Sequence, residues 1–267
     1  MKAAMRQLFR KTKLTIVKLL YGLAGRRRTQ VHPTGRLSIH PSVQRIGGRI
    51  VVGSNSALVL EAGVNLCADL YLGENCRVVI GQRSRIQNAV FRVAHGASIQ
   101  IGAGAMFDSP DHSPNQIVVE GGSMVVAEHV RVQAEILVRF GGRLTIGRYT
   151  GIGYGSEIRC EEQIDIGEYG LFSYDVCIYD SNTHSTDWQE RRQMIERMVA
   201  TGAGEDQRPS TKPVRIGDDV WIGKGATILK GCQIGNRCIV GIRTVVGGSV
   251  YEDDSVIVSP APRRLTR

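Results

Sequence analysis

This chain of 267 residues lacks several features, and each absence excludes a class of protein. Its six cysteines have no paired spacing, so no disulfide framework is expected and a reducing cytosol fits better. The N-terminal apolar run is about ten residues long and Lys18 interrupts it, whereas a membrane-spanning helix needs roughly 20 apolar residues. Prolines number only 8 against 32 glycines, a composition that suits a fold with many tight corners.

Acidic residues are absent from the first 28 positions, which contain nine lysines and arginines. The whole chain has 34 basic and 25 acidic residues, so 34 − 25 gives the net charge of +9. The remainder therefore has 25 basic and 25 acidic residues and no net charge. The basic character belongs to the N-terminal segment and says little about the main domain.

Residues 1–33 are predicted to form a basic amphipathic helix and arm. At about 100° per residue, most basic side chains lie off the apolar face. Such a helix is typical of an anionic membrane surface, but its apolar face would equally cap the open first coil of a repeat protein. A signal peptide would need a small-x-small cleavage site before Arg26, and nothing in the main domain supports nucleic-acid binding. The apolar face comprises Met5, Leu8, Phe9, Thr12, Ile16, Leu19, Leu20 and Leu23.

A six-residue unit recurs from Ile216 to Tyr251, six times without a slip. A period of six fits neither a helix nor a half-buried strand, and it is typical of a parallel β-helix. Each unit should form one short strand and one corner, with a large aliphatic residue and a slender residue pointing inward. The aliphatic residues are Ile216, Ile222, Ile228, Ile234, Val240 and Val246, and the slender ones are Val220, Ala226, Cys232, Cys238, Thr244 and Val250.

Less regular coils precede this stretch. Aliphatic residues that begin successive coils are separated by 20, 21, 25, 20 and 20 residues, and the coils together number nine or ten. We predict an all-β fold, with the β-helix domain over 34–258 and a tail over 259–267. Outward loops are expected at about 107–115 and 184–213, and 189–199 is compatible with a helix. The coil-starting residues are Leu60, Ile80, Ile101, Val126, Ile146 and Ile166.

The run from Pro213 to Val250 resembles the hexapeptide-repeat acyltransferases, with Val220-Trp221-Ile222-Gly223 inside it and a histidine upstream. It is most similar to the branch of sugar O-acetyltransferases, maltose and galactoside acetyltransferases and xenobiotic acetyltransferases. The resemblance implies a left-handed parallel β-helix and a homotrimer with active sites between subunits. It also implies acetyl-CoA as the donor, a saccharide acceptor in bacterial surface polysaccharide synthesis, and no metal.

His184 matches the family histidine that deprotonates the acceptor hydroxyl. An imidazole can take that proton and return it to the CoA thiolate, so transfer is direct and needs no acyl-enzyme. Asp187 and Glu190 are local candidates for orienting the imidazole, and a neighbouring coil or subunit is the alternative source. Backbone N–H groups at coil corners are candidates for holding the oxyanion.

Trp221 matches the family tryptophan that lies along the pantetheine arm of CoA. Glycines and a threonine along the same edge are expected to offer free backbone amides to that arm, and arginines are candidates for its phosphates. The tail and the fifth unit depart from the family pattern, which bears on the CoA contacts. The edge residues are Gly223, Gly225, Gly241 and Thr244, and the arginines are Arg237, Arg243, Arg263 and Arg264.

Other functions share this fold. A γ-type carbonic anhydrase would need three histidines on one zinc, and His95, His112 and His129 occupy different places in their units. An N-acyltransferase acting on an amino sugar, or a non-catalytic β-helix scaffold, stays open. The expected location is the cytoplasm, with contact to the inner face of the membrane through residues 1–28.

Overall fold

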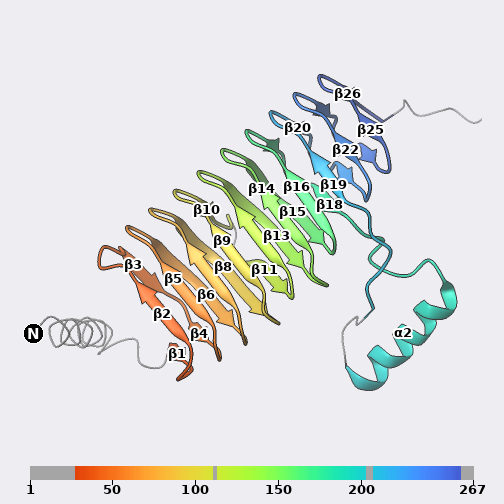
Figure 1. The fold of residues 1–267 in the computed structure, drawn as a ribbon. Coiled ribbons are helices and arrows are strands. Elements are labelled where there is room, and N and C mark those ends of the chain that lie inside the picture. The colour runs from red at the N-terminus through yellow and green to blue at the C-terminus, as the bar shows by residue number, and fades with distance from the viewer. Residues whose placement is uncertain (1–27, 111–112, 203–206, 260–267) are drawn as a thin grey trace, which may run out of the picture.

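The computed structural model describes residues 28–110, 113–202 and 207–259. Their strands stack into a long parallel β-solenoid, and one helix stands apart from it (Figure 1). This confirms the predicted left-handed parallel β-helix of hexapeptide repeats. The predicted N-terminal helix lies outside the described residues. In the part of the chain that is described, no helix is long and apolar enough to cross a membrane.

One face of the solenoid is a ten-stranded parallel sheet, here called the first face. Ten coils contribute one strand each to it, and the solenoid has about 11 turns, slightly more than the nine or ten coils predicted. The strands are β2 (Arg36–Ile39), β5 (Ala57–Leu60), β7 (Arg77–Ile80), β9 (Ser98–Ile101), β12 (Ser123–Val126), β14 (Arg143–Ile146), β16 (Gln163–Ile166), β19 (Val214–Ile216), β22 (Gln233–Ile234) and β25 (Val250–Tyr251).

The remaining sixteen strands form one sheet that folds around a corner into a second and a third face. Long strands cross that corner: the start of β8 pairs with β10, and its end pairs with β11. The strands are β1 (Thr29–Val31), β3 (Arg45–Gly47), β4 (Ile50–Val52), β6 (Asn65–Leu72), β8 (Arg85–Ala94), β10 (Met106–Phe107), β11 (Asn115–Glu120), β13 (Arg131–Val138), β15 (Gly151–Cys160), β17 (Leu171–Phe172), β18 (Cys177–Tyr179), β20 (Trp221–Ile222), β21 (Thr227–Ile228), β23 (Ile239–Val240), β24 (Val245–Val246) and β26 (Val256–Ile257).

The predicted coil starts pair with one another in the first face. Leu60 aligns with Ile80 and Ile80 with Ile101, and the column continues to Ile166 and Ile216. All these side chains are buried, because alternate residues of each strand point into the solenoid. The aliphatic residue that opens each of the six units is buried as well. The hydrophobic core is therefore one continuous column along the solenoid axis.

The sixth hexad is one residue shorter than predicted. Ile234 aligns with Tyr251, 17 residues on, whereas Ile216 aligns with Ile234, 18 residues on. Val250 consequently points outward and is 65% exposed, so its expected place in the core was wrong. Tyr251 packs against the core in its stead, and Ile257 restores the inward pattern six residues later.

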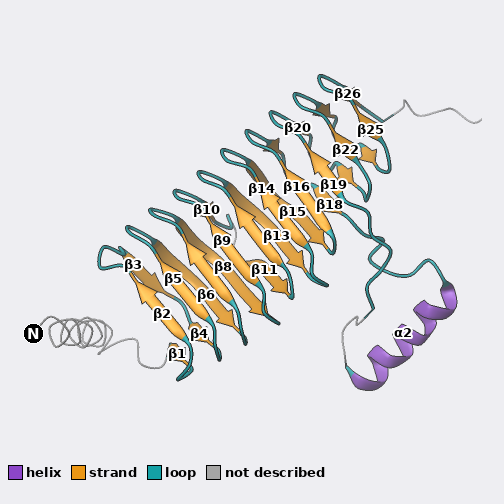
Figure 2. Ribbon diagram, in the orientation of Figure 1, coloured by secondary structure: helices purple, strands orange, loops and turns teal. Residues whose placement is uncertain are grey.

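Two segments leave the stack of coils. The first is shorter than expected, because Phe107 and Asn115 already belong to β10 and β11 and are buried. The second contains α2 (Trp188–Thr201), where the sequence indicates a helix, and this helix projects away from the solenoid (Figure 2). At the N-terminal end, β1 pairs with β4, so the solenoid includes residues ahead of 34.

Candidate active site

The insertion begins at a buried aspartate. Asp180 follows β18 directly and is fully buried, and its carboxylate accepts backbone N–H groups of Glu161, Glu162 and Gln163, each at 2.8 Å. Burial raises the pKa of the Asp180 carboxyl above its usual value, and the three N–H donors act in the opposite direction. These bonds fix the point at which the chain leaves the solenoid.

The two ends of the insertion lie side by side. Ser181 and Thr211 form an antiparallel bridge, and the Asn182 N–H donates to the Ser210 carbonyl at 3.1 Å. The Lys212 N–H donates to the Asp180 carbonyl at 2.8 Å. This pair of ends, here called the neck, sets the residues after Asn182 at a defined height on the corner between the third and first faces.

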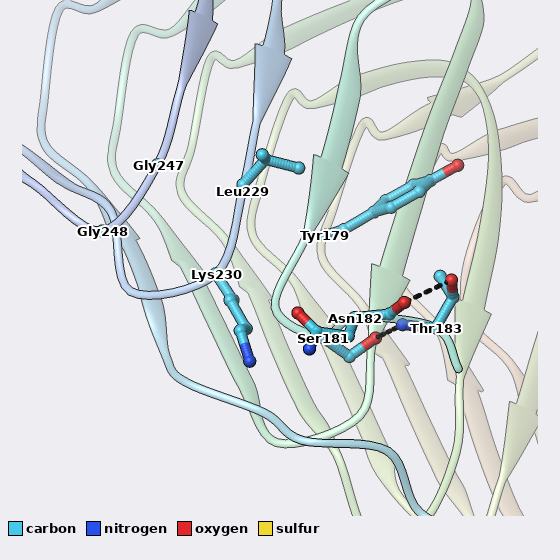
Figure 3. A pocket seen from close by; sticks show the side chains of 8 residues that line it. All are labelled: Tyr179, Ser181, Asn182, Thr183, Leu229, Lys230, Gly247 and Gly248. Carbon is cyan, nitrogen blue, oxygen red and sulfur yellow. Dashed lines mark hydrogen bonds between the residues drawn. The ribbon is translucent and has the colours of Figure 1, made fainter. Parts of the chain in front are cut away.

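A pocket of about 500 Å³ lies beside the neck (Figure 3). On one side Lys230 donates from Nζ to the Ser210 hydroxyl at 2.8 Å and to its carbonyl at 3.3 Å. On the other side the Thr183 hydroxyl donates to the Asn182 carbonyl at 2.6 Å (Figure 3). The pocket thus joins the insertion to the two coils that follow it. Its lining comprises Tyr179, Ser181, Asn182, Thr183, Leu229, Lys230, Gly247 and Gly248.

His184 follows the pocket residue Thr183 directly. Its side chain is exposed, and its backbone N–H donates to the Asn182 carbonyl at 2.7 Å. Thr183 has a φ of 62°, a conformation that β-branched residues rarely adopt and that is found disproportionately at functional sites. The chain therefore makes a tight, strained turn at Thr183, and His184 is the next residue after this pocket residue.

Asp187 stabilises the start of the inserted helix. It is the N-cap of α2, and its carboxylate accepts the Gln189 N–H at 2.8 Å. Glu190 lies in the first turn of the helix, where a negative charge is favourable. The role of either carboxylate in orienting His184 stays a prediction.

Tyr179 contributes a ring to the pocket and belongs to a polar network on the third face. Its hydroxyl donates to Glu157 Oε2 at 2.5 Å, and Arg159 Nε donates to Glu157 Oε1 at 2.5 Å. Burial, followed by the bond to Glu157, raises the pKa of the Tyr179 phenol well above its usual value. Sequence reasoning missed Tyr179, Asp180 and Lys230 as site residues, because no motif marks them.

Trp221 lies at the start of β20 and is 49% exposed. It aligns with Leu171 on one side and Ile239 on the other, on the outer surface of the second face. A flat, half-exposed ring on a strand edge can lie along an extended ligand. It stands on a different face from the pocket beside His184, so the predicted donor and base residues are not brought together within one chain.

The expectation of free backbone amides along the edge was wrong. The Gly223, Gly225 and Gly241 N–H groups donate to the carbonyls of Val240, Tyr174 and Ile257, at 2.7, 2.9 and 2.8 Å. These three amides are used by neighbouring coils, and this pairing cannot be deduced from a glycine pattern. The Gly223 role is steric: a Cβ there would stand 2.7 Å from the backbone nitrogen of Ile242.

The remaining predicted donor residues have varied surroundings. Thr244 is buried, and its hydroxyl accepts the Ser259 N–H at 3.2 Å. Arg237 is engaged in ion pairs with Asp253 and Asp254, at 3.2 and 2.7 Å. Arg243 is exposed at a corner with a φ of 53°, and Arg263 and Arg264 lie outside the described residues.

The histidines considered for zinc stand on corners. His95 and His129 are exposed with φ near 56°, and the His129 ring stacks on Tyr149 at a centroid distance of 5.0 Å. His112 lies outside the described residues. Among residues 28–110, 113–202 and 207–259, no group of three or more His, Cys, Asp or Glu side chains is arranged to hold a metal ion.

A comparison with known protein families agrees with the repeat architecture. Residues 213–248 match the family described as bacterial transferase hexapeptide (six repeats), and no curated protein sequence matches the chain. One similar solved structure is the polySia-specific acetyltransferase NeuO, with 16% identity, 88% coverage of each chain and a TM-score of 0.42. Another is the polysialic acid O-acetyltransferase OatWY, with 18% identity, coverage of 86% of this chain and 84% of that chain, and a TM-score of 0.35.

Similarity at this level to the two solved structures does not establish a shared activity. The matched repeats and the stacked parallel coils do define a class: the chain is a hexapeptide-repeat β-helix protein. The repeat predicted from residues 216–251 is therefore confirmed by an independent comparison over 213–248.

Proposed function

We propose that this protein is an acetyl-CoA-dependent O-acetyltransferase that acts on a saccharide hydroxyl. The observation that carries the proposal is the place of His184. It follows the pocket residue Thr183 directly, on the insertion that leaves the solenoid immediately before the matched transferase repeats. A solenoid interrupted at this point, by a fixed neck and a strained turn, presents a base where an acceptor can enter.

The reaction would proceed in one transfer. The His184 imidazole takes the proton of the acceptor hydroxyl while that oxygen attacks the thioester carbonyl of acetyl-CoA. The C–S bond then breaks, and the thiolate of CoA receives the proton from the imidazolium. An ester and free CoA are the products. No group of the protein has to be acetylated, and the reaction involves no oxidation or reduction.

The donor would lie along the second face, with its pantetheine arm on the Trp221 ring. Because Trp221 and the pocket occupy different faces of one chain, a complete site requires two chains, which supports the homotrimer with intersubunit sites. The exposed apolar side chains of the C-terminal coils offer a surface for that contact. Val245 and Val256 are examples, at 62% and 67% exposed. Sedimentation of the purified chain checks the assembly.

Residues 1–28 support a location at the cytoplasmic face of the membrane, where precursors of surface polysaccharides reside. Their nine basic residues would be attracted to anionic lipids. Vesicle flotation with the full chain, on anionic and neutral lipids, tests this part separately from the chemistry.

The activity is tested with the purified protein, acetyl-CoA and a panel of sugars. Thiol release measures turnover, and mass spectrometry together with mild alkali identifies an ester, since an amide survives that treatment. His184→Ala should lower the rate of transfer about a thousandfold, whereas His129→Ala, at another exposed histidine, should leave it unchanged. Equal turnover by wild type and His184→Ala would refute the assigned base, and stable amide products would identify an N-acyltransferase.

A further inference from the structure

The lining of the pocket beside His184 contains a positively charged side chain and no negatively charged one. Among its eight lining residues, Lys230 is the only ionisable side chain apart from the Tyr179 phenol, and none of the eight is acidic. The rest of the lining is uncharged, with hydroxyl, amide, aromatic and aliphatic groups and two glycines. A ligand that fills this space meets a positive charge and several neutral hydrogen-bonding groups.

The Lys230 ammonium is held in place but not neutralised. It has three N–H donors, and the oxygens of Ser210 accept two hydrogen bonds from it. Both acceptors are neutral, so neither of them compensates the charge. Lys230 is in none of the ion pairs formed within the described chain. Figure 3 shows its side chain among the residues that line the pocket.

The carboxylate bonded to a pocket residue is already engaged elsewhere. Glu157 bonds to the Tyr179 hydroxyl, but Arg159 pairs with it at 2.5 Å. Its negative charge is therefore matched locally and does not serve Lys230. An anion brought by a ligand would be the natural partner of the remaining donor, and a partly enclosed site strengthens that attraction relative to bulk water.

The ligand is better assigned as the acceptor than as the donor. Trp221, the residue proposed for the pantetheine arm, lies on the second face, whereas Lys230 lies at the corner between the third and first faces, next to the segment that carries His184. The hydroxyl to be deprotonated must come within hydrogen-bond reach of the base. The occupant of this pocket is therefore the molecule that supplies the hydroxyl.

We infer that the acceptor is an anionic saccharide, whose carboxylate or phosphate is bound by Lys230 while its neutral hydroxyls contact Ser181, Asn182 and Thr183. This inference rests on the proposed function and narrows it to a class of substrate. A lysine that only tied Ser210 to the next coil would give no preference for charge in the ligand. Charge preference is thus the property that separates the two roles.

The test uses three sugars that differ only at carbon 6: glucose, glucuronic acid and glucose 6-phosphate. Their binding to the full-length protein is measured by saturation-transfer NMR at low salt. The anionic sugars should bind about ten times more tightly than glucose, and salt should reduce the difference. Comparison of the carboxylate with the phosphate identifies which anion the pocket prefers.

Lys230→Met should reduce the preference for the anionic sugars to near unity, with Lys230→Gln as a second variant should the first fold poorly. Two matched controls should keep the preference. Lys212→Met removes an exposed cation of the neck that does not line the pocket, and Ser210→Ala removes the hydroxyl that Lys230 clamps. Circular dichroism checks that each variant is folded.

Three results would overturn the inference. The first is that glucose binds as tightly as its anionic counterparts. The second is that neither anionic sugar binds at millimolar concentration. The third is that Lys230→Met raises the KM for acetyl-CoA and leaves the sugar preference unchanged. The last result would assign Lys230 to the donor phosphates. Failure of the proposed function looks different: the charge preference is present, but no sugar is acetylated under any condition.

Discussion

The coils before and after residue 166 achieve the same triangular stack by different means. The N-terminal coils have strands of up to ten residues, such as β8 and β15, and take 20 or more residues per turn. The C-terminal coils have strands of two or three residues and take 17 or 18. Shorter coils leave less room inside, which agrees with the slender residues at their inner corners.

The two regions also differ on the outside. Within the described residues, the N-terminal coils expose two large aliphatic side chains, Val31 and Val125. The C-terminal coils expose Leu171, Leu229, Ile242, Val245, Val250, Val256 and Val258. The regular region therefore combines the insertion, the pocket and an apolar outer surface. Under the proposed function, the N-terminal coils act as a scaffold and the C-terminal coils carry the site.

The largest expected effect comes from removing the base. His184→Ala should lower kcat by about a thousandfold, within the range typical of general-base catalysis. His129→Ala, in the N-terminal coils, should change kcat by less than twofold, because its ring only stacks on Tyr149. Thiol release under saturating acetyl-CoA measures both. Comparable losses for the two variants would break the division into scaffold and site.

Truncation of a core side chain should lower the unfolding free energy in either region. Only the truncation in the C-terminal coils should also weaken acceptor binding. Ile99→Ala and Ile228→Ala remove side chains that are 1% and 0% exposed, and each should cost about 3 kcal/mol of unfolding free energy. Ile228 precedes the pocket residues Leu229 and Lys230, so only its variant should also weaken acceptor binding. Urea unfolding and sugar binding by NMR give the two readouts. A loss of binding in Ile99→Ala would contradict the comparison.

Adding a methyl group to a glycine should have opposite effects at two places. At Gly223 a Cβ would meet the backbone of the next coil at 2.7 Å, so Gly223→Ala should cost about 1 to 3 kcal/mol. At Gly151 a Cβ would meet nothing within 4 Å, and Gly151→Ala should stabilise by about 0.5 kcal/mol. Thermal unfolding of the two variants measures these changes in stability. Equal destabilisation would mean that coil spacing is not what limits Gly223.

The smallest effect on the reaction is expected from an exposed aromatic ring. Trp221→Ala should raise the KM for acetyl-CoA about tenfold, which corresponds to about 1.4 kcal/mol, and should leave the unfolding free energy nearly unchanged. Tyr149→Ala, whose ring is 50% exposed in the N-terminal coils, is the control and should leave the KM as it is. An unaltered KM in Trp221→Ala would remove this residue from the donor site.

Much of the solenoid could be predicted from the sequence, because each buried column repeats a residue type at a fixed interval. The alignment of Leu60 with Ile80 and Ile101 follows from their spacing alone. The five-residue unit before Tyr251 could not be foreseen, since a tyrosine in place of an aliphatic residue gives no sign of pointing inward. The prediction of free backbone amides at Gly223 and Gly241 was wrong for a related reason. The sequence does not show which carbonyl of the next coil faces each N–H.

The site was predicted only in part. His184 could be chosen because it matches the family histidine that precedes the inserted loop, and its role stays a prediction. Asp180 and Lys230 gave no signal, because their significance arises from groups distant in the chain: the amides of residues 161–163 for one, and the Ser210 oxygens for the other. Such contacts depend on how the coils stack, so they cannot be predicted from the sequence of a single coil.

The neck has a consequence for engineering and for evolution. Because Ser181 and Thr211 meet in a bridge, the segment between them starts and finishes at nearly one point. Loops closed in this manner tolerate changes in length at little entropic cost. A foreign segment spliced between these two positions would leave the register of every coil intact, so new acceptor chemistry can be grafted onto an unchanged frame.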